Sequence, residues 1–179
     1  MRFNLVLSGV GGQGIIFAAR LMARMALERD WPVIGAETHG MAQRGGSVVA
    51  HLRFGGAKGS LVGSGSAEAL ISFKEEEGYR NLGLVEPGGD VFINSPGPSL
   101  RPEAGEYLKR QKISSHLIDA DRLALDHGLP RAANLIMVGF ACGTGSLPFS
   151  WTELEETVKA ASPERFLEDN LKAINLGRS

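Results

Sequence analysis

Two short stretches of this chain contain residue types that could bind a ligand or take part in a reaction. The first, LSGVGGQGI near the N-terminus, spaces Gly9, Gly11 and Gly14 as GxGxxG. In a strand-to-helix turn, this spacing lets a phosphate approach the backbone, where free N–H groups and the helix dipole favour an anion. Gly12 and Gln13 fill the variable positions, and a Gln side chain offers an amide to a neighbouring loop or ligand. These five residues are therefore candidate cofactor-binding residues.

The second stretch, ETHGMAQRGGSV, brings a carboxylate, an imidazole, an amide and a guanidinium together within eight residues: Glu37, His39, Gln43 and Arg44. Glu37 stands 23 residues after Gly14, where a dinucleotide site would place an acid on a ribose hydroxyl. An ordinary polar loop is the simpler interpretation, because exposed ion pairs contribute little. So many reactive side chains beside a glycine turn favour a functional surface, and all four are candidate active-site-facing residues.

The apolar periodicity predicts the elements that position both stretches. FNLVLSG is typical of a buried strand, and apolar residues then recur at helical spacing to about Arg29. WPVIGAE predicts a second strand, so residues 1–37 form a parallel β-α-β unit, followed by a polar loop at 38–46. Further strands are predicted at 68–73, 88–95 and 115–119, and further helices at 75–82, 103–111 and 120–127. Three more helices are predicted near the C-terminus. Asn134 would cap the first, the capping-box pair Ser150 and Glu153 would start the second, and Ser162 followed by Pro163 would start the third.

One pair of apolar segments predicts an antiparallel addition to this sheet. SVVAHLRF at 47–54 and GSLVG at 59–63 flank GGAK, which indicates a β-hairpin. Strands that alternate with helices are typical of an α/β fold. We therefore expect a Rossmann-like three-layer α/β/α architecture with a mostly parallel, mixed sheet carrying a β-hairpin, and a single domain over residues 1–179.

Composition narrows the classes of function. The 179 residues carry a net charge of −1, which gives no overall field for nucleic acid or an anionic membrane. No apolar run reaches the roughly 18 residues of a membrane span, and the N-terminus lacks a signal-like pattern, so we expect a cytoplasmic protein. Cys142 is the single cysteine, whereas an iron–sulfur cluster takes about four. The four histidines show no metal-ligand spacing, so no metal site is expected in this chain.

Taken together, GVGGQGI and ETHGMAQRGGSVVAHLRF closely resemble the gamma-type domain of 2-oxoacid:ferredoxin oxidoreductases. EALISF, GGDVFINS, AANLIMVGFACGT and NLKAINLG extend the resemblance over nearly the whole chain. The length is most similar to the beta subunit of the indolepyruvate-type enzymes. The resemblance implies oxidative decarboxylation of a 2-oxoacid, with indolepyruvate or another aryl pyruvate as the expected substrate, to an acyl-CoA, with coenzyme A as co-substrate and electrons passed to ferredoxin. It also implies a large partner subunit that holds thiamine diphosphate, Mg and the iron–sulfur clusters. This chain would complete the active-site region and be inactive alone.

Two other functions stay open at this point. A free-standing NAD(P)- or flavin-binding oxidoreductase would use the GxGxxG turn and Glu37, and a non-catalytic docking module would use the polar stretch only to bind a partner. Met41, inside that stretch, is a candidate contact for a partner or an aryl substrate. The acidic run at 74–77 is interpreted as a solvated face, with docking of an electron carrier as the alternative.

Overall fold

The structure is a computed structural model that describes residues 1–41 and 45–178. Within these residues one six-stranded sheet has the order β2-β3-β1-β4-β5-β6. Its strands are β1 (Phe3–Val10), β2 (Val33–His39), β3 (Ser47–Phe54), β4 (Ala67–Ser72), β5 (Val85–Asn94) and β6 (Ser114–Ile118). The strands β1, β4, β5 and β6 run parallel, whereas β3 is antiparallel to both of its neighbours.

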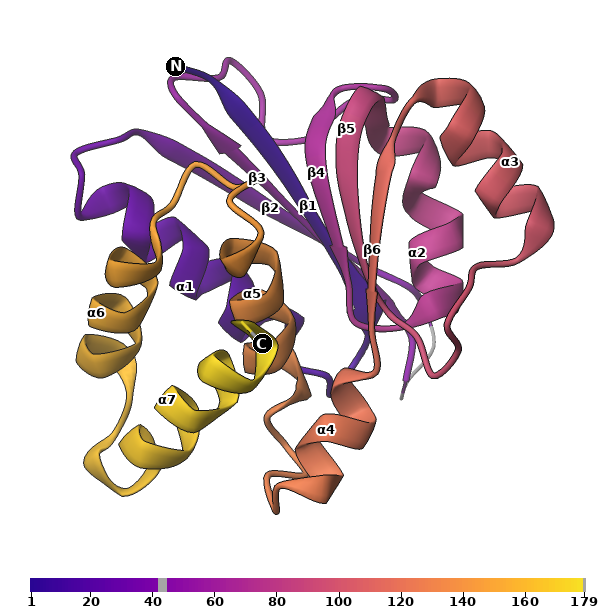
Figure 1. Cartoon of the computed structure of the whole chain (residues 1–179). Helices are drawn as coiled ribbons and strands as arrows, with labels where there is room; N and C mark the ends of the chain where they lie inside the picture. Colours follow the sequence, from indigo (N-terminus) through magenta and orange to yellow (C-terminus); the bar gives the residue numbers. More distant parts are fainter. Residues whose placement is uncertain (42–44, 179) are drawn as a thin grey trace.

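Helices cover both faces of this sheet (Figure 1). One face packs against α1 (Ile15–Leu27), α4 (Ala120–Asp126), α5 (Ala133–Gly143), α6 (Trp151–Ala161) and α7 (Glu164–Arg178), and the other against α2 (Glu75–Asn81), the short 3-10 turn η1 (Leu82–Leu84) and α3 (Pro102–Gln111). Strand β1 is buried on both sides, with Leu5 and Leu7 facing the first layer and Val6 facing the second. The predicted mixed, three-layer α/β/α fold is confirmed.

The position of the hairpin differs from the sequence-based expectation. The hairpin joins β2 to β3, and residues 59–63 do not form a strand. Strand β3 already has β1 and β2 on its two edges, so no edge remains for a third partner. Side chains hold the segment instead: Arg53 donates to the carbonyl oxygens of Gly59 and Leu61, at 3.0 and 3.3 Å. The expected parallel β-α-β unit is also modified, because β3 lies between β1 and β2.

Two predicted helix starts have different outcomes. The capping box of α6 is confirmed, because Ser150 and Glu153 exchange side-chain-to-backbone hydrogen bonds. The predicted cap of α5 is wrong, because Ala132 occupies the N-cap position and Asn134 lies within the first turn. The last helix begins at Glu164, directly after Pro163. Among the described residues no helix combines the length and apolar character needed to cross a membrane.

Candidate functional site

The glycine turn lies where β1 ends and α1 begins, beside the loop that joins β2 to β3. The Gly11 N–H donates to the carbonyl oxygen of Gly46 at 2.9 Å, which fastens the two segments together. Gly14 occupies the N-cap position of α1, with a φ of 79°, and no side chain caps the helix. The two motifs that stood out in the sequence are therefore neighbours in space.

Gln13 fills the gap between two parallel strands at their carboxyl ends. Its side-chain oxygen accepts a hydrogen bond from the Val10 N–H at 2.8 Å, and its amide nitrogen donates to the carbonyl oxygen of Phe73 at 2.9 Å. Val10 ends β1, and Phe73 directly follows β4. The chain leaves β1 toward α1 on one face of the sheet and leaves β4 toward α2 on the other face. This is therefore the topological switch point, where open α/β sheets bind ligands. Here a side chain of the protein occupies that crevice.

The space left by the missing side chain of Gly14 is taken by another residue of the protein, Asn134. A Cβ atom at Gly14 would lie 2.3 Å from the side-chain nitrogen of Asn134, on α5. In the dinucleotide fingerprint, missing side chains let pyrophosphate reach the backbone. At this turn Asn134 packs against the glycine, so the seat for a buried pyrophosphate is partly filled.

A polar pocket of about 440 Å³ remains outside this turn. Its lining includes Gly12, Gln13, Asp121, Arg131 and Asn134. The Asp121 carboxylate accepts a hydrogen bond from Asn94 at 3.0 Å, and Asn94 also donates to the Phe73 carbonyl oxygen. Arg131 is exposed, so the pocket offers a cation beside the backbone of the glycine turn.

Glu37 and His39, the candidate residues of the second stretch that the structure describes, are both exposed. Glu37 lies on β2 as predicted, and the strand also includes His39, which was expected in the loop; their side chains approach to 3.6 Å. Met41 is fully exposed. Gln43 and Arg44 lie outside the described residues, so their predicted place in the site stays a prediction.

Sequence reasoning missed Glu77. The acidic run was interpreted as a solvated face, but Glu77 is only 2% exposed. Its carboxylate accepts a hydrogen bond from the Ser47 hydroxyl at 2.7 Å and pairs with Arg80. It therefore ties the start of β3, directly after the polar stretch, to α2. The run KEEE gave no signal for this burial, because it depends on the helix face that meets β3.

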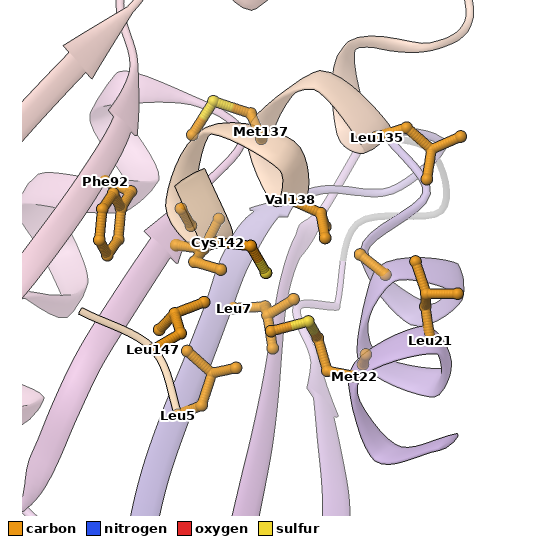
Figure 2. Packing of buried hydrophobic residues seen from close by; sticks show 14 of the residues in the cluster. Leu5, Leu7, Leu21, Met22, Phe92, Leu135, Met137, Val138, Cys142 and Leu147 are labelled. Carbon is orange, nitrogen blue, oxygen red and sulfur yellow. The ribbon is translucent and has the colours of Figure 1, made fainter. Parts of the chain in front are cut away.

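The single thiol belongs to the hydrophobic core. Cys142 lies on α5 among Leu5, Leu7 and Met22 (Figure 2). Burial raises the pKa of the Cys142 thiol to about 12, with a smaller contribution from Glu153. Cys142 is therefore a small side chain of the core and is not exposed at the surface. Among the described residues, no three His, Cys, Asp or Glu side chains are grouped so that they could hold a metal ion.

Known proteins resemble the chain over its whole length. The family described as pyruvate ferredoxin/flavodoxin oxidoreductase matches residues 4–179. This chain belongs to that family. It is 34% identical to the indolepyruvate oxidoreductase subunit IorB of Pyrococcus horikoshii, over 98% of this chain and 94% of the relative. It is 33% identical to IorB of Archaeoglobus fulgidus, over 99% of this chain and 94% of that one.

Solved structures share the fold of this family member. A keto/oxoacid ferredoxin oxidoreductase gamma subunit from Geobacter sulfurreducens has a TM-score of 0.75 at 23% identity, over 98% of this chain and 96% of that one. A 2-oxoglutarate:ferredoxin oxidoreductase from Magnetococcus marinus, described with 2-oxoglutarate, coenzyme A and succinyl-CoA bound, has a TM-score of 0.79 at 21% identity, over 99% of this chain and 30% of that one. The resemblance to the gamma-type domain is confirmed, and the chain is a subunit of a 2-oxoacid:ferredoxin oxidoreductase.

Proposed function

We propose that this chain is the cofactor-free subunit of an indolepyruvate-type 2-oxoacid:ferredoxin oxidoreductase and acts as one domain over residues 1–179. The observation that carries the proposal is its similarity to four archaeal indolepyruvate oxidoreductase subunits, at 31–34% identity over 98–99% of this chain. The oxidoreductases matched at 21–24% identity are named for ketoisovalerate and 2-oxoglutarate, so the aryl-substituted substrate is the favoured one.

The partner subunit would supply the cofactors. The single cysteine, Cys142, is buried in the core and does not suit an iron–sulfur cluster, and the described residues contain no group of His, Cys, Asp or Glu side chains that could hold Mg. We assign thiamine diphosphate, Mg and the clusters to a larger subunit, which passes electrons to ferredoxin. The contribution of this chain would be a surface that completes the region where the acyl group meets coenzyme A.

The carboxyl edge of the parallel strands is the part of this chain that we assign to that surface. It contains the glycine turn, with Gly9, Gly11, Gly12, Gln13 and Gly14, and the polar pocket beside it. The backbone of the turn and the guanidinium of Arg131 suit a phosphate, and coenzyme A carries several. Gln43 and Arg44 would act at the same surface, with Glu37 and His39 beside them on β2.

Reconstitution with the large subunit tests the function. Oxidation of indolepyruvate with coenzyme A and ferredoxin should require both chains together, and each chain alone should give little activity. Pyruvate, 2-oxoglutarate and 2-oxoisovalerate should be poorer substrates. Full activity of either chain by itself would contradict the proposal, and a preference for another 2-oxoacid would reassign the substrate.

Variants separate catalysis from docking at this surface. Arg131→Gln should raise KM for coenzyme A several-fold and leave KM for the 2-oxoacid unchanged, whereas Arg122→Gln on α4 serves as the control, because Arg122 pairs with Asp126 at the surface. Ala variants of His39, Gln43 and Arg44 should lower kcat in the assembled complex. Weaker assembly with unchanged turnover would instead support a docking role only.

The free-standing NAD(P) or flavin enzyme is the less favoured function. Gln13 fills the switch-point crevice and Asn134 packs on Gly14. We expect no rise in the melting temperature of the isolated chain with millimolar NAD(H) or flavin, although a ligand specific for the folded state would produce one. A clear rise with either cofactor would reverse this preference.

A further inference from the structure

Within the described residues, no strand pairs with the outer side of β2, which forms one edge of the sheet. Strand β2 is the edge strand, it has seven residues, and its register with β3 is continuous. Natural proteins protect such edges with short strands, lysine, proline or bulges. The sequence of β2, VIGAETH, contains neither lysine nor proline. The opposite edge strand, β6, has only five residues.

The pairing with β3 shows which backbone groups of β2 point outward. The Gly55 N–H donates to the Pro32 carbonyl oxygen, and the Gly40 N–H donates to the Ser47 carbonyl oxygen. In an antiparallel pair the residues alternate between those that exchange hydrogen bonds and those that do not. Even-numbered residues of β2 therefore bond to β3. The residues that present both N–H and C=O to the open edge are Val33, Gly35, Glu37 and His39.

We propose that β2 pairs antiparallel with β2 of a second copy of this chain, centred on Ala36, to make one continuous sheet across the dimer. In this register Gly35 lies opposite Glu37 of the second copy, and Val33 lies opposite its His39. All four outward-facing residues of each strand are then paired. The register centred on Glu37 would place the two Glu37 carboxylates opposite each other, and like charges directly opposite destabilise a sheet. The register centred on Gly35 would leave His39 without a partner in β2 of the second copy.

In this register, a groove beside β2 would receive the Glu37 side chain of the second copy. It has a volume of about 310 Å³ and lies between α1 and the strand, with Arg20, Gly35 and the chain's own Glu37 in its lining. Residues directly opposite in a sheet project to the same face. Gly35 shares the face of Leu52, which packs in the core with α1. Glu37 of the second copy would therefore enter this groove, toward the exposed guanidinium of Arg20.

The other face of the strand also fits a second copy. In the same register Ile34, which is 37% exposed, lies opposite Thr38 of the second copy, and Ala36 lies opposite itself. Two β-branched side chains form a favourable cross-strand pair. Arg20 forms no ion pair within the described part of the chain, so Glu37 of the second copy would supply its counter-charge.

Charge reversal in two different chains tests the pairing. We expect sedimentation of the isolated chain to show a concentration-dependent dimer. Arg20→Glu or Glu37→Arg alone should weaken it by about 10- to 100-fold, because each places like charges together. An equimolar mixture of these two variants should form heterodimers, since both contacts are then complementary. Recovery across chains excludes an effect within one chain. The control is Lys109→Glu on α3, which makes the same charge change and should leave the dimer unchanged.

A backbone variant tests the strand itself. Gly35→Pro removes an outward N–H and no bond to β3, so it should abolish the dimer and leave thermal unfolding of the monomer nearly unchanged. Three results would overturn the proposal: a chain that stays monomeric at all concentrations, a dimer insensitive to all these variants, or failure of the mixed variants to associate. Hydrogen exchange could give a fourth contradicting result. If the β2 amides become protected only when the large subunit is added, the edge strand binds that subunit and not a second copy.

Discussion

The glycine turn and strand β2 are neighbours that use their polar groups in opposite ways. In the turn, Gln13 bonds to backbone groups of two strands and Asn134 packs on Gly14. On β2, Glu37 and His39 are exposed and contact mainly each other. The turn that looks most like a cofactor site is occupied in part by the protein, although a pocket remains beside it, whereas the edge strand β2 is open among the described residues. The difference shows that a glycine motif by itself does not establish a dinucleotide site, because side chains of the protein can take part of the space that the motif opens.

Substitution of Gly14 should have the largest effect on stability. Gly14→Ala places a side chain at positive φ against Asn134, and we expect a loss of about 2–3 kcal/mol in the free energy of unfolding. Gly12→Ala also falls at positive φ but meets no atom within 4 Å, so a loss of about 1 kcal/mol is expected. Denaturant unfolding measures both. The double variant Gly14→Ala, Asn134→Ala should lose less than the sum, and strict additivity would show that the contact contributes nothing.

The bonds of Gln13 should have the next largest effect. Gln13→Ala removes a donor and an acceptor from partly buried backbone groups, for a loss of about 1–3 kcal/mol. Gln13→Met keeps most of the volume and should be nearly as destabilised, which separates hydrogen bonding from packing. If both variants keep their stability and raise KM for coenzyme A in the assembled enzyme, Gln13 is a ligand contact. The contrast between a self-filled turn and an open β2 would then be wrong.

A pH titration tests the buried histidine of the β2–β3 hairpin. Burial lowers the pKa of His51 on β3 from its ordinary value of 6.5, and its ring nitrogen accepts a hydrogen bond from the Val62 N–H. The unfolded chain therefore binds the proton first, so this contribution to stability is present above about pH 6.5 and is lost as pH falls below it. His51→Asn should flatten the dependence of unfolding free energy on pH between 6.5 and 5.

The smallest effect is expected on the open strand. His39→Ala removes an exposed side chain whose one ion-pair partner in the described residues is Glu37, so the free energy of unfolding should change by about 0.5 kcal/mol or less. Thermal or denaturant unfolding at low protein concentration measures this without a contribution from association. A loss as large as that of Gln13→Ala would show that β2 is integrated into the fold as tightly as the turn.

Much of the fold could be predicted from local patterns. The strand FNLVLSG, the amphipathic helix after it and the capping box of Ser150 and Glu153 each depend on residues close together in the chain. The hairpin was predicted between 47–54 and 59–63 but joins β2 to β3. Both 33–39 and 59–63 have the pattern of a strand, and a local pattern does not show which edge of β3 is still free. Glu77 was misjudged for a similar reason, since its burial depends on Ser47, thirty residues away.

The sequence by itself determined the α/β class, the family and the two motifs that carry the resemblance, because glycine spacing and apolar periodicity are properties of neighbouring residues. Only the tertiary structure decided what those motifs do. Gln13 could have faced a ligand or a strand end, and the insertion of β3 between β1 and β2 decided which edge stays open. Hydrogen-bond partners and free edges depend on which distant segments fold together, and this information is absent from any single stretch of the chain.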